Sequence, residues 1–266
     1  MWRALIWDVD GTLAETERDG HLVAFNQAFA AMGLPWRWDD ECYARLLEVT
    51  GGRERLLFDM ASRADTPSSA AEREALAAEL HRLKNARYAD VVAQGAISLR
   101  PGVRELLDDC AQAGLPMAVA TTTSRVNLQA LMVATLGVHW QHRFAATLCA
   151  EDAPRKKPDP QIYQRALAAL GMDAGDALAI EDAPAGVIAA RAAGVPVIVT
   201  RSHYFAAAEV RAAQAVGPGL HCAAGWSPAP PPLPPHAAEN GRISLATLQA
   251  WAPALRGIEF RGTIEG

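Results

Sequence analysis

The chain has 266 residues, of which 50% are hydrophobic and 21% are charged, and its formal net charge is −5. This composition is too apolar for a disordered chain, and the acidity disfavours nucleic acid or a membrane surface as partner, because both need a basic face. The four cysteines are scattered and no apolar run reaches the length of a membrane helix, so we expect a cytoplasmic monomer that binds neither nucleic acid nor a membrane.

The first predicted element is a buried strand over the apolar residues 4–9, which runs into a turn at Gly11. Residues 16–95 are different, because their apolar side chains recur at helical spacing and no convincing strand interrupts them. The sequence therefore predicts an all-helical domain over 16–95, inserted into a core that is formed by 1–15 and 96–266.

After residue 100 the pattern alternates between strands and helices. Strands are expected at 116–120, 144–148, 177–180 and 195–200, and helices at 103–113, 127–136, 160–170 and 184–193. Strands that alternate with helices of 10–15 residues indicate parallel βαβ units. We therefore predict an α/β fold whose core is a doubly wound parallel sheet with Rossmann-like topology.

The sequence after the sheet begins with a change in composition. Prolines crowd the stretch 228–235, which predicts a stiff polyproline II segment at the surface, over about 226–236. A proline-rich ligand for another domain is the alternative interpretation. A pattern typical of folded sequence resumes at 243–255.

The first candidate for chemistry is the acidic pair Asp8 and Asp10 at the end of the first strand. Carboxylates two residues apart on a strand project from the same face. Like charges so close repel each other unless a cation lies between them or one carboxyl stays protonated. Oxygen ligands beside a tight glycine turn suit Mg²⁺, although a plain acidic strand end is the alternative.

Three more polar clusters follow predicted strands or the loops after them, where open α/β sheets bind their ligands. Thr121 offers a hydroxyl and a helix N-terminus to an anion, unless it is an ordinary helix cap. Lys157 is one of only three lysines, and it is either a solvated surface lysine or an ammonium that balances the paired carboxylates. Glu181 and Asp182 either begin a helix or complete an oxygen cage with Asp8 and the Asp10 carbonyl.

In this order, the four clusters resemble the motifs of the haloacid dehalogenase (HAD) superfamily over about residues 1–205. The resemblance implies a HAD core with a small helical cap and Mg²⁺ as cofactor. It further implies that Asp8 forms an aspartyl-phosphate, that Asp10 serves as general acid and base, and that Thr121 and Lys157 hold the phosphoryl oxygens. The metal ligands that it implies are Asp8, Asp10, Glu181 and Asp182.

Residues 15–21, 24–26, 36–38, 50–55 and 120–124 are similar to the CbbY-type sugar-phosphate phosphatases. That similarity implies hydrolysis of xylulose 1,5-bisphosphate, an inhibitor of Rubisco in the Calvin cycle. The substrate ligands that it implies are Glu17, His21, Gly51, Gly52, Arg53, Arg55, Thr122 and Thr123. Two positions depart from the pattern, since Arg53 replaces the usual lysine and Leu22 replaces a basic residue.

Other activities remain open at this stage. A β-phosphoglucomutase-like phosphomutase shares the same machinery, and a phosphatase for phosphoglycolate or another sugar phosphate is a second alternative. A signalling receiver domain is disfavoured, because here the acidic residues are split by a helical insert. Dehalogenation is disfavoured because Asp10 supplies an acid which that reaction does not need.

Overall fold

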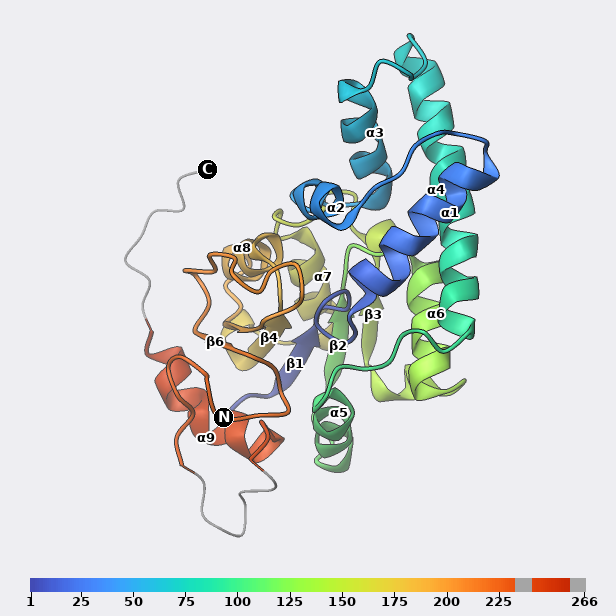
Figure 1. Ribbon diagram of the computed structural model, residues 1–266. Coiled ribbons are helices and arrows are strands. Elements are labelled where there is room, and N and C mark those ends of the chain that lie inside the picture. Colours follow the sequence, from blue (N-terminus) through green and yellow to red (C-terminus); the bar gives the residue numbers. More distant parts are fainter. Residues whose placement is uncertain (233–240, 259–266) are drawn as a thin grey trace.

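The computed structural model of the chain describes residues 1–232 and 241–258, and it is built around one parallel sheet (Figure 1). The strand order is β3-β2-β1-β4-β5-β6, and every neighbouring pair is parallel. The strands are β1 (Ala4–Trp7), β2 (Met117–Ala120), β3 (Ala146–Leu148), β4 (Ala177–Glu181), β5 (Val197–Thr200) and β6 (Ala215–Gly217). The predicted doubly wound α/β core is confirmed, with β1 between β2 and β4.

Helices cover both faces of the sheet. They are α5 (Val103–Gln112), α6 (Arg125–Leu136), α7 (Gln161–Leu170), α8 (Pro184–Ala192) and α9 (Leu245–Arg256), with short 3₁₀ turns η2 (Trp140–Arg143), η3 (Ala150–Asp152) and η4 (Ala174–Asp176). Alternate residues of β1 point to opposite faces: Leu5 and Trp7 pack with α5, α6 and α9, whereas Ala4 and Ile6 pack with α7 and α8. Both faces of β1 are therefore buried, as its uninterrupted apolar run predicts.

The chain between β1 and α5 is helical, and no strand lies within residues 16–95, all of which are described. Its elements are the π-helical turn η1 (Glu17–Leu22) and the helices α1 (Val23–Ala31), α2 (Asp40–Leu46), α3 (Gly52–Ser62) and α4 (Ala70–Ala93). These helices enclose their own aromatic cluster, which includes Phe25, Phe29, Trp36, Trp38 and Tyr43. Figure 1 shows them gathered beyond one end of the sheet, while α4 also packs on α6. The division into two domains at residues 15 and 95 stays a prediction.

The sequence after β5 completes the sheet and then returns to the start of the chain. The folded stretch predicted at 243–255 is confirmed as α9, whose Gln249 side chain hydrogen-bonds both the N–H and the C=O of Trp2. Of the proline-rich segment at 226–236, residues 233–236 lie outside the described residues. In the part that is described, Trp226 is buried and Pro228 is exposed at the surface. None of the described helices has the length and apolar character that crossing a bilayer requires.

Candidate active site

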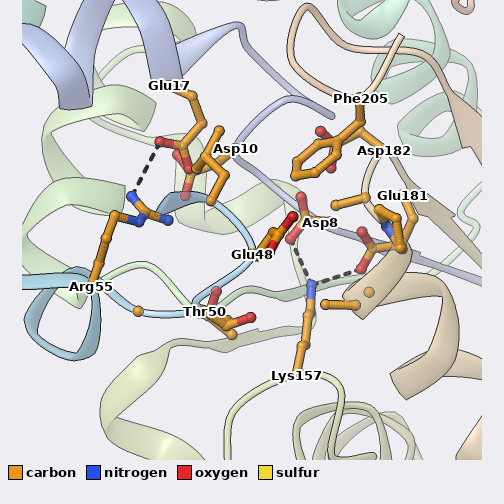
Figure 2. A pocket seen from close by; sticks show the side chains of 17 residues that line it. Asp8, Asp10, Glu17, Glu48, Thr50, Arg55, Lys157, Glu181, Asp182 and Phe205 are labelled. Carbon is orange, nitrogen blue, oxygen red and sulfur yellow. Dashed lines mark hydrogen bonds and ion pairs between the residues drawn. The ribbon is translucent and has the colours of Figure 1, made fainter. Parts of the chain in front are cut away.

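A cavity of about 310 Å³ opens between the carboxyl ends of the strands and the helices of residues 17–93. The sheet side contributes Asp8, Asp10, Lys157, Glu181 and Asp182, and the helical side contributes Glu17, Glu48, Thr50, Gly51 and Arg55. In Figure 2 the two sets face each other, with Lys157 directed at Asp8 and Glu181 and with Arg55 directed at Glu17. Residues from distant parts of the sequence are thus brought to one site, as the strand-end rule predicts.

Lys157 lies between two buried carboxylates on the sheet side. Its Nζ is 2.6 Å from Asp8 Oδ1 and 2.7 Å from Glu181 Oε1. Burial by itself would lower the pKa of Lys157, but Asp8 and Glu181 outweigh burial and raise that pKa. The hydroxyl of Tyr163, on α7, also donates to Glu181. The ammonium is therefore charged and fixed beside Asp8.

Asp8, Glu181 and Asp182 form a buried acidic group whose ligand oxygens all lie within 4.8 Å of one another. Burial and the charge of Glu181 raise the pKa of Asp8 to about 7, although Lys157 acts in the opposite direction. Burial, Asp8 and Glu181 also raise the pKa of Asp182, which accepts a 2.6 Å hydrogen bond from Ser202. Three buried carboxylates beside one ammonium leave two negative charges, and their oxygens are the ligands that divalent cations prefer. The donor set fits a divalent metal ion.

The carboxylate of Asp10 turns toward the helical segment. It accepts a 2.5 Å hydrogen bond from the Thr16 hydroxyl and lies 3.0 Å from Nε2 of His21. Burial would raise the pKa of Asp10, but the charge and hydrogen bond of His21 and the bond from Thr16 outweigh burial and lower this pKa to about 2. His21, whose ring stacks on Tyr88 at 4.3 Å, is therefore engaged with Asp10 through Nε2.

The predicted phosphate-binding threonines follow β2. Thr121 is buried, and its hydroxyl accepts the backbone N–H of Thr123 at 3.2 Å, but neither cavity described here includes Thr121 in its wall. Thr122 lines the main cavity, and Thr123 lines a smaller one that adjoins it. Ser124 is the N-cap residue of α6, but its side chain makes no capping hydrogen bond. Its buried hydroxyl has no hydrogen-bond partner among the described residues.

The two arginines predicted from the Gly-Gly turn have different environments. Arg55 is only 6% exposed, lines both cavities, and donates to the Tyr43 hydroxyl at 2.8 Å. Arg53 lies in neither cavity wall; it is half-exposed and pairs with Glu74 at 2.5 Å. Side chains two positions apart on a helix point about 200° away from each other around its axis. Only one of the two arginines can therefore face the site. Arg53 lies outside both cavity walls in this structure, and its contact with the substrate stays a prediction.

A smaller cavity of about 40 Å³ lies beside the main one, and sequence reasoning missed four of its polar side chains. Lys84 and His81, on α4, line it together with Ser124 and Asn127 on α6. Lys84 is 3% exposed, and its Nζ has no ion pair or hydrogen bond within residues 1–232 and 241–258. The scarcity of lysine drew attention to Lys157, whereas Lys84 lies in the middle of a helix and no sequence signal distinguished it from a surface lysine.

Comparison with known proteins adds three findings. The family model of the haloacid dehalogenase-like hydrolases matches residues 2–194. Protein CbbY of Cupriavidus necator is 44% identical over 251 residues, which cover 94% of this chain and 96% of that protein. A crystal structure of mutant CbbY from Rhodobacter sphaeroides in complex with xylulose-(1,5)bisphosphate is 37% identical, with a TM-score of 0.79, and covers 85% of this chain and 97% of that chain.

A more distant likeness concerns the fold alone. A β-phosphoglucomutase from Clostridium difficile superposes with a TM-score of 0.65 at 21% identity, over 83% of this chain and 92% of that chain. This likeness shows that the two chains share a fold.

Proposed function

The chain belongs to the haloacid dehalogenase-like hydrolases, and on that premise we propose that it is a Mg²⁺-dependent phosphatase whose substrate is xylulose 1,5-bisphosphate. One observation carries this proposal. The fixed Asp8–Lys157 pair lies on one side of a continuous polar site, while the cationic groups of Arg55 and Lys84 lie on the other. A site with a cationic side chain at each end suits a substrate with a phosphate at each end.

In the first step of this proposal, the carboxylate of Asp8 attacks phosphorus while Lys157 holds a non-bridging oxygen. The bond from phosphorus to the sugar oxygen breaks, and that oxygen takes a proton from Asp10. Thr121 is proposed to hold a second non-bridging oxygen. In the hydrolytic step, Asp10 removes a proton from water, which attacks the aspartyl-phosphate and releases inorganic phosphate and free Asp8.

His21 supports the two roles of Asp10. Asp10 must carry a proton in the first half-reaction and accept one in the second, although the pKa of about 2 favours its ionised form. Nε2 of His21 lies 3.0 Å from Oδ1 of Asp10, which is hydrogen-bond distance. The imidazole and the carboxyl group can therefore share one proton. We propose that Nε2 of His21 acts on Asp10, while the contact of His21 with a sugar hydroxyl stays a prediction.

The proposed Mg²⁺ would be held by Asp8, Asp182 and the Asp10 carbonyl, with Glu181 close by. When bound, a divalent cation there favours the ionised carboxylates and neutralises charge on the phosphoryl group. Glu181, which Lys157 and Tyr163 already engage, would act mainly by fixing Lys157.

The smaller cavity is proposed to take the second phosphate. The buried ammonium of Lys84 is available there, and the buried hydroxyl of Ser124 lacks a partner in the described structure. The N-terminus of α3, at Gly51 and Gly52, lines the same cavity and adds N–H donors. Arg55, Thr122 and Thr123 complete the cavity, and Glu17 is proposed to contact sugar hydroxyls.

We further propose that residues 16–95 act as a cap over this core, and that the protein is a cytoplasmic monomer. Contacts between the two parts support the first point: Lys156 pairs with Glu54 at 2.6 Å, and the Tyr204 hydroxyl donates to Asp40 at 2.7 Å. A cap closed in this way excludes water from the site, which is the usual purpose of a lid.

Release of inorganic phosphate from xylulose 1,5-bisphosphate tests the proposal. We expect release with Mg²⁺, none with a chelator, and none in Asp8→Asn, which keeps the size of the side chain but removes the nucleophile. The exposed Asp173→Asn is the matched control and should retain full activity. Conversion of β-glucose 1-phosphate to the 6-phosphate without phosphate release would instead establish a mutase.

A further inference from the structure

The hydroxyl of Ser202 is committed to one carboxylate oxygen of Asp182. It donates to Oδ2 at 2.6 Å, and both residues are buried. The same Oδ2 lies against Gly11, where a Cβ would come within 2.0 Å of it. Oδ2 is therefore held from two sides, which leaves Oδ1 of Asp182 to face a cation in the acidic group.

The bond between Ser202 and Asp182 joins the ends of two neighbouring strands. Strand β4 ends at Glu181 and β5 ends at Thr200, and the two are paired with Glu181 opposite Val199. Ser202 thus follows β5 at the same edge of the sheet at which Asp182 follows β4. Its side chain lies outside the wall of the main cavity, whereas Asp182 is part of that wall.

Arg100 holds the backbone on which both Ser202 and Gly11 lie. Its guanidinium donates to the carbonyls of Gly11 and Arg201, and to the carbonyl of Thr200 at 3.2 Å. A planar guanidinium presents five N–H donors in a fixed geometry, so one side chain can bind several carbonyls at once. Arg100 therefore fixes the position of Ser202 relative to the turn at Gly11.

Glu15 completes this arrangement. Its Oε1 lies 3.3 Å from Nε of Arg100, and its Oε2 accepts the backbone N–H of His203 at 3.3 Å. Glu15 precedes the helical segment of residues 16–95 and Arg100 follows it, so both connections to that segment are joined to the loop after β5. The charge of Arg100 is thus paired outside the group of Asp8, Glu181 and Asp182.

We propose that Ser202 and Arg100 are positioning residues of the divalent-metal site. Ser202 turns Oδ1 of Asp182 toward the cation, and Arg100 keeps Ser202 beside the Gly11 turn. A hydrogen bond to a ligating carboxylate fixes its orientation before the ion arrives, so less conformational freedom is lost on binding. This inference rests on the proposed Mg²⁺ site.

Binding of the metal alone to the full-length, substrate-free protein tests the inference. Free Mn²⁺, which takes the same kind of oxygen ligands as Mg²⁺, is measured by electron paramagnetic resonance, and Mg²⁺ is then added as competitor. Ser202→Ala should raise the Kd of both ions about 10- to 100-fold. Arg100→Lys keeps the charge but loses the fork of donors, and it should weaken binding of both ions as well.

Ser244→Ala is the matched control. Ser244 is also buried and hydrogen-bonded, but it caps α9 and lies outside both cavity walls. Its loss should lower resistance to urea and leave the Kd for Mn²⁺ unchanged. A purely structural role of Ser202 would give the same pattern, so the metal Kd separates the two roles.

Phosphate release provides a second readout. Ser202→Ala should need about 10- to 100-fold more Mg²⁺ for its half-maximal rate. At saturating Mg²⁺, its KM for xylulose 1,5-bisphosphate should equal that of wild type, because Ser202 lies outside the wall of the main cavity.

An unchanged Kd for Mn²⁺ and Mg²⁺ in Ser202→Ala overturns the inference and leaves the proposed phosphatase intact. If the wild-type protein binds neither ion, the proposed metal site is removed and the inference is lost with it. Should Ser202→Ala fail to fold, an unchanged Kd in Arg100→Lys overturns the inference in its place.

Discussion

At the scale of single residues, Lys84 shows how the binding site and the stability of the fold oppose each other. Its ammonium is buried against the rings of Phe25 and Tyr88, at 5.0 and 5.5 Å, without an anionic partner at bonding distance in the described residues. Burial therefore lowers the pKa of Lys84 to about 8, despite the charges of Glu17 and Asp10. A charge held in this way lowers the free energy of unfolding until a ligand neutralises it.

Replacing Lys84 should consequently stabilise the protein. In the unfolded state the lysine has its ordinary pKa of 10.5, so between pH 8 and 10.5 the unfolded state binds more protons, and stability rises with pH. Lys84→Met should raise the free energy of unfolding by up to about 3 kcal/mol near pH 7, and the gain should vanish as pH approaches 10.5. Urea unfolding of both proteins across this pH range measures it.

The same variant should bind the bisphosphate more weakly, since the second phosphate loses a cation. A gain in stability that stays constant from pH 7 to above 10.5 would contradict the titration of Lys84. The exposed Arg82, on the same helix, gives the control Arg82→Met, whose stability should differ little from wild type at any pH.

Which functional residues could be predicted depends on where they lie. Asp8, Lys157 and Asp182 follow apolar strands or adjoin them, and the strand-end rule singles out such positions in a parallel sheet. Lys84, His81 and Tyr163 lie inside amphipathic helices, where spacing alone cannot distinguish a ligand from a surface residue. Their roles follow only from which helix face the tertiary packing turns toward the cavity.

At the scale of elements, the first turn of α8 packs directly on the carboxylate of Glu181. A Cβ on Gly186 would overlap the carboxylate of Glu181. That carboxylate has little freedom to move, because Lys157 and Tyr163 both donate to it. Glycine at position 186 therefore allows α8 to pack closely against the end of β4.

Gly186→Ala should therefore impair catalysis more than folding. Alanine favours the helix by about 1 kcal/mol, which partly offsets the overlap, but Glu181 must move away from Lys157. We expect kcat to fall at least about tenfold, as measured by phosphate release. Gly175→Ala, where a Cβ has nothing within 4 Å, is the control and should retain wild-type kcat. Unchanged kcat in Gly186→Ala would show that the position of Glu181 is not critical.

The elements themselves were predicted to different degrees. Strands β1, β2, β4 and β5 carry apolar runs between turn residues, so the sequence predicts them to within two residues at most ends. Strand β6 is only Ala215–Gly217, too short for a run, and it forms because β5 offers a free edge. The sequence did not predict where α2 and α3 begin. Helix α2 begins at the Asp39 cap, and α3 begins after Gly51, whose φ is positive.

At the scale of the whole molecule, α9 packs against the beginning of the chain. Trp251 is buried against Trp226, with ring centroids 5.5 Å apart, and α9 shares a core cluster with Trp2, Leu5 and Trp7. Arg242 pairs with Asp109 on α5 at 2.8 Å and holds the approach to α9 in place. The C-terminal helix is thus part of the main core, although it lies far from the catalytic cavity.

Trp251→Ala should test that integration. Loss of a fully buried tryptophan should lower the free energy of unfolding by about 3–5 kcal/mol, whereas Trp251→Phe should lose much less. Well below the unfolding transition, KM for the bisphosphate should stay unchanged, because α9 contributes nothing to the cavity wall. Urea unfolding and steady-state kinetics check both results. A loss below about 1 kcal/mol would show that α9 is a dispensable appendage.

The position of β1 in the sheet has a consequence for the protein as it leaves the ribosome. Strand β1 emerges early, yet its neighbours β2 and β4 begin at Met117 and Ala177, so it must wait without a partner. Residues 17–93 emerge during that delay, and their helices pack largely on one another, chiefly α1 on α4, so they can fold before β2 is synthesised. During biosynthesis, the proposed cap should therefore take shape before the carboxylates of Asp8, Glu181 and Asp182 are brought together.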